Sequence, residues 1–437
     1  MGSYIPSSPA DRKRMLDALG IDSVDQLFAA VPEQARLKQL DLPEGLSEAE
    51  TVRRMEEIAD KNVVFRDVFR GAGAYRHYIP AAVKEITSRQ EFLTAYTPYQ
   101  AEISQGVLQS IFEYQTQICQ LTGMDVSNAS VYDGATAAAE AVFMCQERNR
   151  TGVVVSGAVH PHVLQTIKTY CESRSVPVTV LPVRRCATDP ADLAGVMENA
   201  AALYVQTPNY YGVIEPAEEL IAAAHAAGAK AILGVNPISL GLLKTPGELG
   251  ADVAVGEGQP LGMPVAFGGP YLGFMACRQP LVRKLPGRIV GQTVDAEGRR
   301  CFVLTLQARE QHIRREKASS NVCSNEALCA MTASVYLAAM GPRGLRRAAE
   351  SSAAHAHYLA QQLAPLGFAL RSGTRAFFHE FLTDCPVDAE TLCRKLEDAG
   401  ILGGLPVEGG ILWCCTECND KAGIDKLVAT IREVCGK

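Results

Sequence analysis

Three absences narrow the roles open to this chain of 437 residues. Lys and Arg number 42 against 48 Asp and Glu, so a net charge of −6 leaves no basic excess to attract a nucleic-acid backbone. No apolar run approaches the ~18 residues that span a bilayer. Residues 1–20 lack the apolar segment of a secretory signal. We therefore expect a cytoplasmic protein that binds neither nucleic acid nor membrane.

The remaining composition is typical of a soluble globular protein. At about 150 residues per domain, the length favours two to three domains. Hydrophobic residues make up 47% and charged residues 21%, close to the globular average. Fourteen cysteines are scattered through a chain without an export signal, which indicates reduced, buried thiols rather than a disulfide framework.

Apolar patterning predicts a helical N-terminal arm followed by two α/β domains. Residues 1–100 form the arm and an interface segment, with helix entries at Ser8 and Ser47 and too few apolar residues for a core. In residues 101–341, apolar runs of strand length alternate with helical segments, as in a wound, mostly parallel sheet covered on both faces. Residues 342–437 resemble a small α+β domain. The expected strands of the large domain are 152–156, 176–183, 201–205, 231–235, 253–255 and 271–276.

Three polar motifs allow both a chemical and a structural interpretation. Gly134 and Thr136 precede an alanine-rich helix, whose N-terminal N–H groups could hold a phosphate, although a capped turn is the simpler explanation. His160-Pro161-His162 lacks a third metal ligand, so we favour a helix-start turn with one functional or packed imidazole. The Cys-x-x-Cys within 414–418 lacks a second pair, so we interpret it as buried strand thiols and expect no metal site.

A dense charge run, residues 309–317, continues into a polar turn. It fits a solvated helix face and a subunit interface or cleft equally well.

Longer segments carry a resemblance to a known family. They are residues 96–106, 132–136, 256–262, 268–270, 285–291 and 304–321. Together they resemble the glycine cleavage system P-proteins, in the form divided between two chains, and the first of those two chains in particular. The resemblance implies the fold of the aspartate-aminotransferase-like enzymes that use pyridoxal phosphate (PLP), known as fold type I.

The resemblance also implies an activity and partners. In this family, glycine loses its carboxylate as carbon dioxide while PLP serves as an electron sink, and the aminomethyl remainder moves to the lipoyl arm of the H-protein. We therefore expect glycine, lipoylated H-protein and a second P-protein subunit as partners. The expected assembly is a heterodimer or a dimer of heterodimers.

The PLP lysine of the family motif is missing here. The catalytic motif His-Lys-Thr-Phe-x-x-Pro-His aligns with residues 258–265, which places Gln259 at the lysine position. Asn236 stands where such enzymes carry the aspartate that pairs with the pyridine nitrogen. The resemblance thus implies PLP in the partner subunit and none covalently bound to this chain. The implied vestigial cofactor cleft contains Gly134, Thr136, His160, Asn236 and Gln259.

A second group of residues is expected to complete the active site shared with the partner. The loop before the helix at 103–121 combines two phenols, an amide and a carboxylate, and Pro98 restricts its backbone. The alternative is that the tyrosines pack at an interface with their hydroxyls bonded. The shared-site candidates are Tyr96, Tyr99, Gln100, Glu102, Gln105, Arg309 and His312.

Two other functions stay open at this point. A self-sufficient PLP enzyme, such as a threonine aldolase or an aminotransferase, would use another lysine and give the isolated chain a yellow colour. A purely structural scaffold would leave the activity of the assembly unchanged when Tyr99 or His312 is mutated.

Overall fold

The computed structural model describes residues 7–436 except 38–39, 97, 308–310, 319 and 323–324. It separates into two units, Met1–Val64 and Phe65–Lys437. The divisions that we expect near residues 100 and 341 stay our proposal for the domains.

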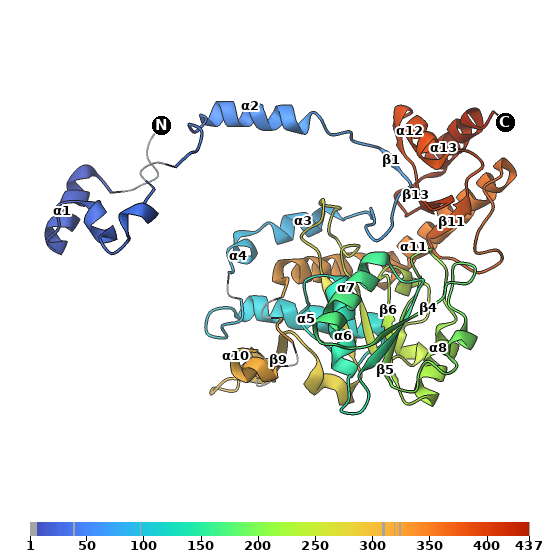
Figure 1. Cartoon of the computed structure of the whole chain (residues 1–437), viewed down its shortest axis with the longest axis horizontal. Helices are drawn as coiled ribbons and strands as arrows, with labels where there is room; N and C mark the ends of the chain where they lie inside the picture. The colour runs from blue at the N-terminus through green and yellow to red at the C-terminus, as the bar shows by residue number, and fades with distance from the viewer. Residues whose placement is uncertain are drawn as a thin grey trace. The chain divides into compact units, whose positions relative to one another are not determined.

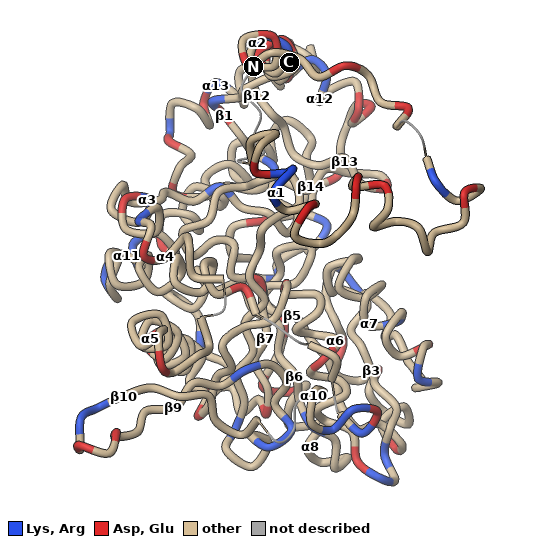
Figure 2. The backbone as a smooth tube through the Cα atoms, turned by 90° about the vertical axis from the view of Figure 1, so that its left-hand side faces the viewer, with Lys and Arg blue, Asp and Glu red and all other residues tan. Residues whose placement is uncertain are grey.

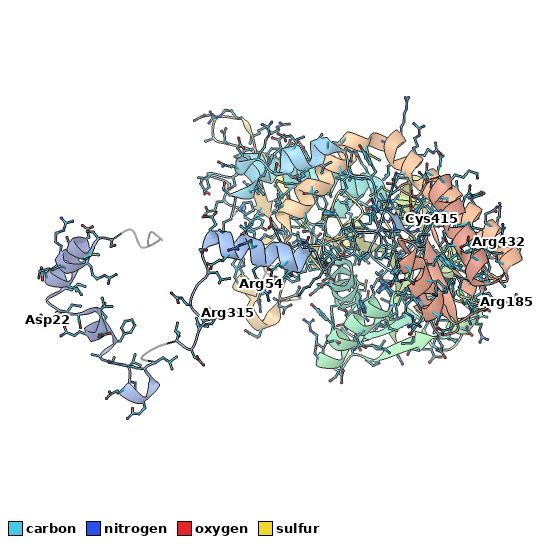
Figure 3. The ribbon with its side chains drawn as sticks, turned by 90° about the horizontal axis from the view of Figure 1, so that it is seen from above. Asp22, Arg54, Arg185, Arg315, Cys415 and Arg432 are labelled. Atoms are coloured by element: carbon cyan, nitrogen blue, oxygen red, sulfur yellow. The ribbon has the colours of Figure 1, made fainter. Side chains whose placement is uncertain are left out.

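The first unit consists of short helices without a core. Its helices are α1 (Pro9–Leu19), η1 (Val24–Phe28), η2 (Glu33–Ala35) and α2 (Glu48–Ala59). The predicted helix entries are confirmed, because Ser8 and Ser47 each form a reciprocal capping box, with Asp11 and Glu50. None of these four helices buries a side chain within the described residues. On α2, Arg54 pairs with Glu57 in solvent (Figure 3).

The second unit is built around a seven-stranded sheet with the order β2-β8-β7-β6-β5-β3-β4. Strands β4, β3, β5, β6 and β7 are parallel, and β8 is antiparallel to both of its neighbours. The predicted wound sheet is therefore confirmed. Its strands are β2 (Val126–Ser127), β3 (Gly152–Ser156), β4 (Val178–Leu181), β5 (Ala200–Gln206), β6 (Lys230–Gly234), β7 (Val253–Glu257) and β8 (Gly273–Cys277).

Helices cover both faces of this sheet. Along β5, Leu203 and Val205 enter one core cluster while Ala202 and Tyr204 enter another, the alternation of a strand buried on both sides. Figure 1 shows α6 and α7 side by side next to the strands. The remaining helices of this part are α3 (Ala81–Thr87), α4 (Gln90–Leu93), α5 (Gln105–Thr122), α6 (Gly134–Cys145), α7 (Pro161–Ser173), α8 (Ala217–Ala226), α9 (Pro246–Leu249) and α10 (Gln311–Arg314).

Short 3₁₀ turns and a hairpin complete the large part of the unit. The hairpin pairs β9 (Ile289–Val294) with β10 (Arg300–Thr305). The 3₁₀ turns of this part are η3 (Pro190–Leu193), η4 (Ser239–Gly241), η5 (Gln279–Lys284) and η7 (Arg315–Lys317), whereas η8 (Ala364–Leu366) belongs to the C-terminal part. Charges of both signs are interspersed along the backbone of the unit (Figure 2).

A long helix leads into the C-terminal part. Helix α11 (Ala327–Leu363) is interrupted at Gly341, with φ 60° and ψ 177°, immediately before Pro342. Pro342 lacks the N–H that would continue the hydrogen bonding of the preceding turn, so the helix is divided at this position. The antiparallel sheet that follows has the order β11 (Glu380–Asp384), β14 (Gly410–Cys414), β13 (Leu405–Val407), with α12 (Ala389–Asp398) and α13 (Lys421–Val434) packed against it. Strand β1 (Asp67–Val68) pairs in parallel with β12 (Ile401–Leu402).

The thirteen described cysteines are all free thiols, and most are buried. Cys414 and Cys415 are buried at the end of β14, and Figure 3 marks Cys415 in this part of the unit. Cys418 is exposed in the turn before α13, so the prediction of buried strand thiols is wrong for that residue. No group of three potential metal ligands occurs among the described residues. No described helix is both long and apolar enough to cross a bilayer.

Candidate functional site

A cleft of about 220 Å³ opens at the carboxyl edge of the parallel strands. His160 follows β3, Gln206 ends β5, Asn236 follows β6 and Glu257 ends β7, and all four line the cleft. Parallel strands of a wound sheet bring their carboxyl ends to one edge, which is where such folds bind ligands. The sheet topology therefore explains why residues from four separate segments meet here.

The N-terminus of α6 borders the same cleft. Asp133 is its N-cap and accepts from the Thr136 backbone N–H at 2.7 Å. The Gly134 backbone N–H instead donates to Oε2 of Glu257 at 2.9 Å. Two N–H groups in the first turn of α6, which have no partner within the helix, are thus bound by the carboxylates of Glu257 and Asp133.

Glu257 is held by three backbone donors. Besides Gly134, the N–H groups of Gln259 and Leu272 each donate to its Oε1 at 3.0 Å. Burial raises the pKa of Glu257 to about 7, against the opposing effect of these hydrogen bonds. The carboxyl group therefore titrates near neutral pH within a site built from backbone N–H groups.

Gln259 fastens a segment of residues 71–77, which we call the strap. Its Oε1 accepts from the Tyr75 N–H at 3.0 Å, and its Nε2 donates to the Tyr75 carbonyl at 2.9 Å. Nε2 also donates to the Met263 carbonyl at 2.7 Å. The side chain is fully buried, and its amide has a partner for each donor and for its acceptor.

Two further side chains hold the strap across the cleft. His160 Nδ1 accepts from the His162 N–H, so the ring proton is on Nε2, which donates to the Ala72 carbonyl at 2.8 Å. Glu380 accepts from the Ala72 N–H and from the Tyr75 hydroxyl, each at 2.6 Å. Burial lowers the pKa of His160 and raises the pKa of Glu380 to about 7. The imidazole is therefore neutral, and it works as a helix cap and a strap anchor.

Gly73 lets the strap approach His160 closely. Its φ of +102° is unfavourable for other residues, and a Cβ there would lie 2.7 Å from His160 Nε2. A side chain at this position would push the strap away from the cleft.

Some buried polar atoms of the cleft have no hydrogen-bond partner among the described residues. They are Nδ2 of Asn236 and both ring nitrogens of His379. The Oδ1 of Asn236 is bonded to the N–H of Ile238 at 2.9 Å, so its amide nitrogen is the free end. Burial, with His77 nearby, lowers the pKa of His379 well below its usual value.

Comparison with known proteins assigns the family. The model of the glycine cleavage system P-protein family matches residues 2–431. The chain belongs to the glycine cleavage system P-protein family. It is 48% identical to a probable glycine dehydrogenase (decarboxylating) subunit 1 from Thermomicrobium roseum, over 98% of this chain and 99% of that protein.

Solved structures agree with this family and with the predicted fold. A crystal structure of glycine decarboxylase (P-protein) in inhibitor-bound form has a TM-score of 0.94 and 42% identity, covering 99% of this chain and 100% of that chain. A C-DES mutant with glycine covalently linked to its PLP cofactor has a TM-score of 0.61 at 15% identity, covering 86% and 98%, and shares the fold alone. The chain has the PLP-dependent fold of type I.

The residues of this cleft do not fit covalently bound PLP. No lysine lines the cleft in the part of the chain that the structure describes. The lysines nearest to Gln259 in sequence are engaged elsewhere, Lys244 with Glu218 at 2.6 Å and Lys284 with the Gln146 carbonyl at 2.8 Å. Asn236 offers no acid for a protonated pyridine nitrogen.

The structure brings together most of the residues predicted for the vestigial cofactor cleft. Gly134, His160 and Asn236 line the cleft, Thr136 lies in the first turn of α6, and Gln259 lies behind the cleft against the strap.

The shared-site candidates that the structure describes lie outside this cleft. Tyr99 lies under the Arg288 guanidinium, 4.3 Å from the ring centroid, and its hydroxyl donates to Asn325 Oδ1. Gln105 is bound to the backbone of Phe302 by both ends of its amide. Arg309 lies outside the described residues. The exposed members are Tyr96, Gln100, Glu102 and His312.

Sequence reasoning missed four residues that define the cleft. They are Tyr75, Glu257, His379 and Glu380. The one available signal was Glu257, a charged residue directly after the apolar run 253–255. A charge at the carboxyl end of a buried parallel strand is a typical position for a functional group.

Proposed function

We propose that this chain is subunit 1 of a glycine-decarboxylating P-protein and acts only together with a second subunit. Together the two subunits decarboxylate glycine and transfer the aminomethyl group to the lipoyl arm of the H-protein. The supporting observation is the full-length similarity to subunits 1 of glycine dehydrogenase, combined with a cleft whose lysine position holds a bonded glutamine. When bound, PLP supplies the electron sink for decarboxylation, and we place it in the partner.

The contribution of this chain is to shape and complete the partner's site. Tyr99 is half-buried, and its hydroxyl is oriented by Asn325, which in turn donates to the Ala129 carbonyl at 3.1 Å. Arg288 places a cation over the same ring. The Arg288 guanidinium can bind the carboxylate of glycine or an anionic group of the cofactor. The phenol, whose proton goes to Asn325, holds this loop in place and can accept one further hydrogen bond.

The first unit supports an obligate partner. Its helices bury no side chain among the described residues, and Phe28, Met15 and Met55 are each more than half exposed. Apolar helix faces of this kind need a covering surface. We propose that they pack on the second subunit.

We expect the isolated chain to show no glycine-dependent exchange of carbon dioxide, and the co-purified pair to show it with H-protein present. The measurement is isotope exchange between labelled bicarbonate and the glycine carboxyl group. The same samples, treated with PLP and borohydride, should carry the modified lysine on subunit 2. Exchange by the isolated chain, or a modified lysine in it at full occupancy, would overturn the proposal.

A Tyr99→Phe variant should lower glycine turnover of the assembled enzyme by about 10- to 100-fold, since an unmade buried hydrogen bond costs about 1–3 kcal/mol. Assembly size should stay unchanged, because the ring and its contact with Arg288 remain. The matched control is Tyr358→Phe, which removes a hydroxyl bonded to Asp425 at 2.7 Å in the C-terminal part. Equal turnover in the two variants would assign the loop a structural role and favour the scaffold function.

A further inference from the structure

The anion-binding end of α6 is already filled by a side chain of this chain. Backbone N–H groups from three segments converge on one carboxyl group: Gly134 opens α6, Gln259 follows β7 and Leu272 precedes β8. Their distances to the Glu257 oxygens are 2.9 to 3.0 Å. A helix N-terminus with additional N–H donors is the arrangement that binds phosphate groups in many proteins.

We infer that Glu257 is an internal anion that takes the place of a ligand's phosphate in this cleft and keeps phosphorylated molecules out. The inference rests on the proposed function, in which the second subunit carries PLP, and explains how this subunit avoids competing for it. The missing lysine removes only the covalent bond, whereas a filled phosphate position also removes the non-covalent binding.

The surroundings of Glu257 support an exclusion role rather than simple packing. Its side chain has no Lys or Arg partner among the described residues, so its charge is balanced by backbone dipoles alone. Asp133, the N-cap of α6, adds a second carboxylate at the same helix end. A phosphate entering the cleft would meet two carboxylates and few free N–H groups.

The strap restricts the other route by which a phosphorylated molecule could enter the cleft. Gln259, whose backbone N–H binds Glu257, holds Tyr75 with its side chain. The filled anion position and the closed strap therefore share one residue. Replacement of the cofactor lysine and exclusion of its phosphate are parts of the same local structure.

Anion rescue tests this inference on the full-length chain. A Glu257→Ala variant should melt at a lower temperature than wild type, and inorganic phosphate or acetate at pH 8 should restore stability in a saturable way. Wild type should show no saturable gain in stability at phosphate concentrations up to about tenfold above the half-saturating value of the variant, a margin that one regained charged hydrogen bond accounts for. Glu219→Ala, at an exposed position of α8, is the control for a lost carboxylate. Equal anion responses of Glu257→Ala and wild type would overturn the inference.

A measurement on wild type covers the case in which the alanine variant does not fold. Hydrogen exchange of the Gly134, Gln259 and Leu272 amides should be slow and unchanged by inorganic phosphate. Added protection of these amides by phosphate would show that an external anion enters, and the inference would fail. Covalent PLP on wild type, by contrast, would contradict the proposed function itself, so the two failures are distinguishable.

Discussion

A Gln259→Ala variant is expected to lose about 3–5 kcal/mol of unfolding free energy. The change leaves the Tyr75 N–H, the Tyr75 carbonyl and the Met263 carbonyl without their buried partner. Each unmade buried hydrogen bond costs about 1–3 kcal/mol, and partial relaxation reduces the sum. Urea unfolding followed by the fluorescence of Trp413, the single tryptophan, measures this loss.

Two other substitutions separate hydrogen bonding from packing. Gln259→Glu keeps the volume but turns a carboxyl oxygen toward two carbonyl groups, so it should also destabilise strongly at pH 8. Gln279→Ala, at an exposed position, should change the unfolding free energy by less than about 0.5 kcal/mol. A Gln259→Ala loss no larger than that of Gln279→Ala would show that the strap is not held by this residue.

The sheet was predictable because its strands are buried on both faces. Residues 152–156 and 253–255 are nearly unbroken apolar runs, and they form β3 and most of β7. The helix expected at 103–121 is α5, and it ends at Gly123, whose φ of +68° is the left-handed conformation of a helix C-cap. Such signals are local, so a single segment carries them.

The strap was not predictable, since its bonds are distant in sequence. Tyr75 and Gln259 lie 184 residues apart, and Tyr75 and Glu380 lie 305 apart. Nothing local marks residues 71–77 as the cover of a cleft, and sequence patterning assigned this region to the arm and interface segment. In the structure, residues 71–77 belong to the unit Phe65–Lys437.

The candidate site was predictable in part, through the family motif. The family motif places Gln259 at the lysine position, and the structure shows which groups its amide binds there. The motif does not identify Glu257, because its importance comes from three N–H groups that converge only in the folded chain. The position of Gln259 in the motif is visible in sequence, whereas the carboxyl group that we propose in place of the phosphate is visible only in three dimensions.

Glu257 and Glu380 should each make the chain less stable as pH rises from about 4.5 to 7. Burial raises the pKa of each to about 7 in the folded state, above the ordinary value of 4.5. The folded state therefore binds the proton more tightly, and the stability present below pH 4.5 is lost as pH rises through 7. The loss reaches up to about 3 kcal/mol for each residue, at 1.36 kcal/mol per pKa unit.

The effect is best measured as a difference between wild type and Glu→Gln variants across this pH range. His160 and His379, whose pKa values are lowered by burial, lose stability in the opposite direction, as pH falls. Subtraction removes their contribution, because they are present in both proteins. The stability advantage of wild type over Glu257→Gln or Glu380→Gln should shrink as pH rises from 5 to 8. For Glu219→Gln, at an exposed position, the difference should stay constant. A constant difference for Glu257 and Glu380 would mean that both carboxyl groups are ionised throughout this pH range. Their hydrogen-bond donors would then lower the pKa by more than burial raises it.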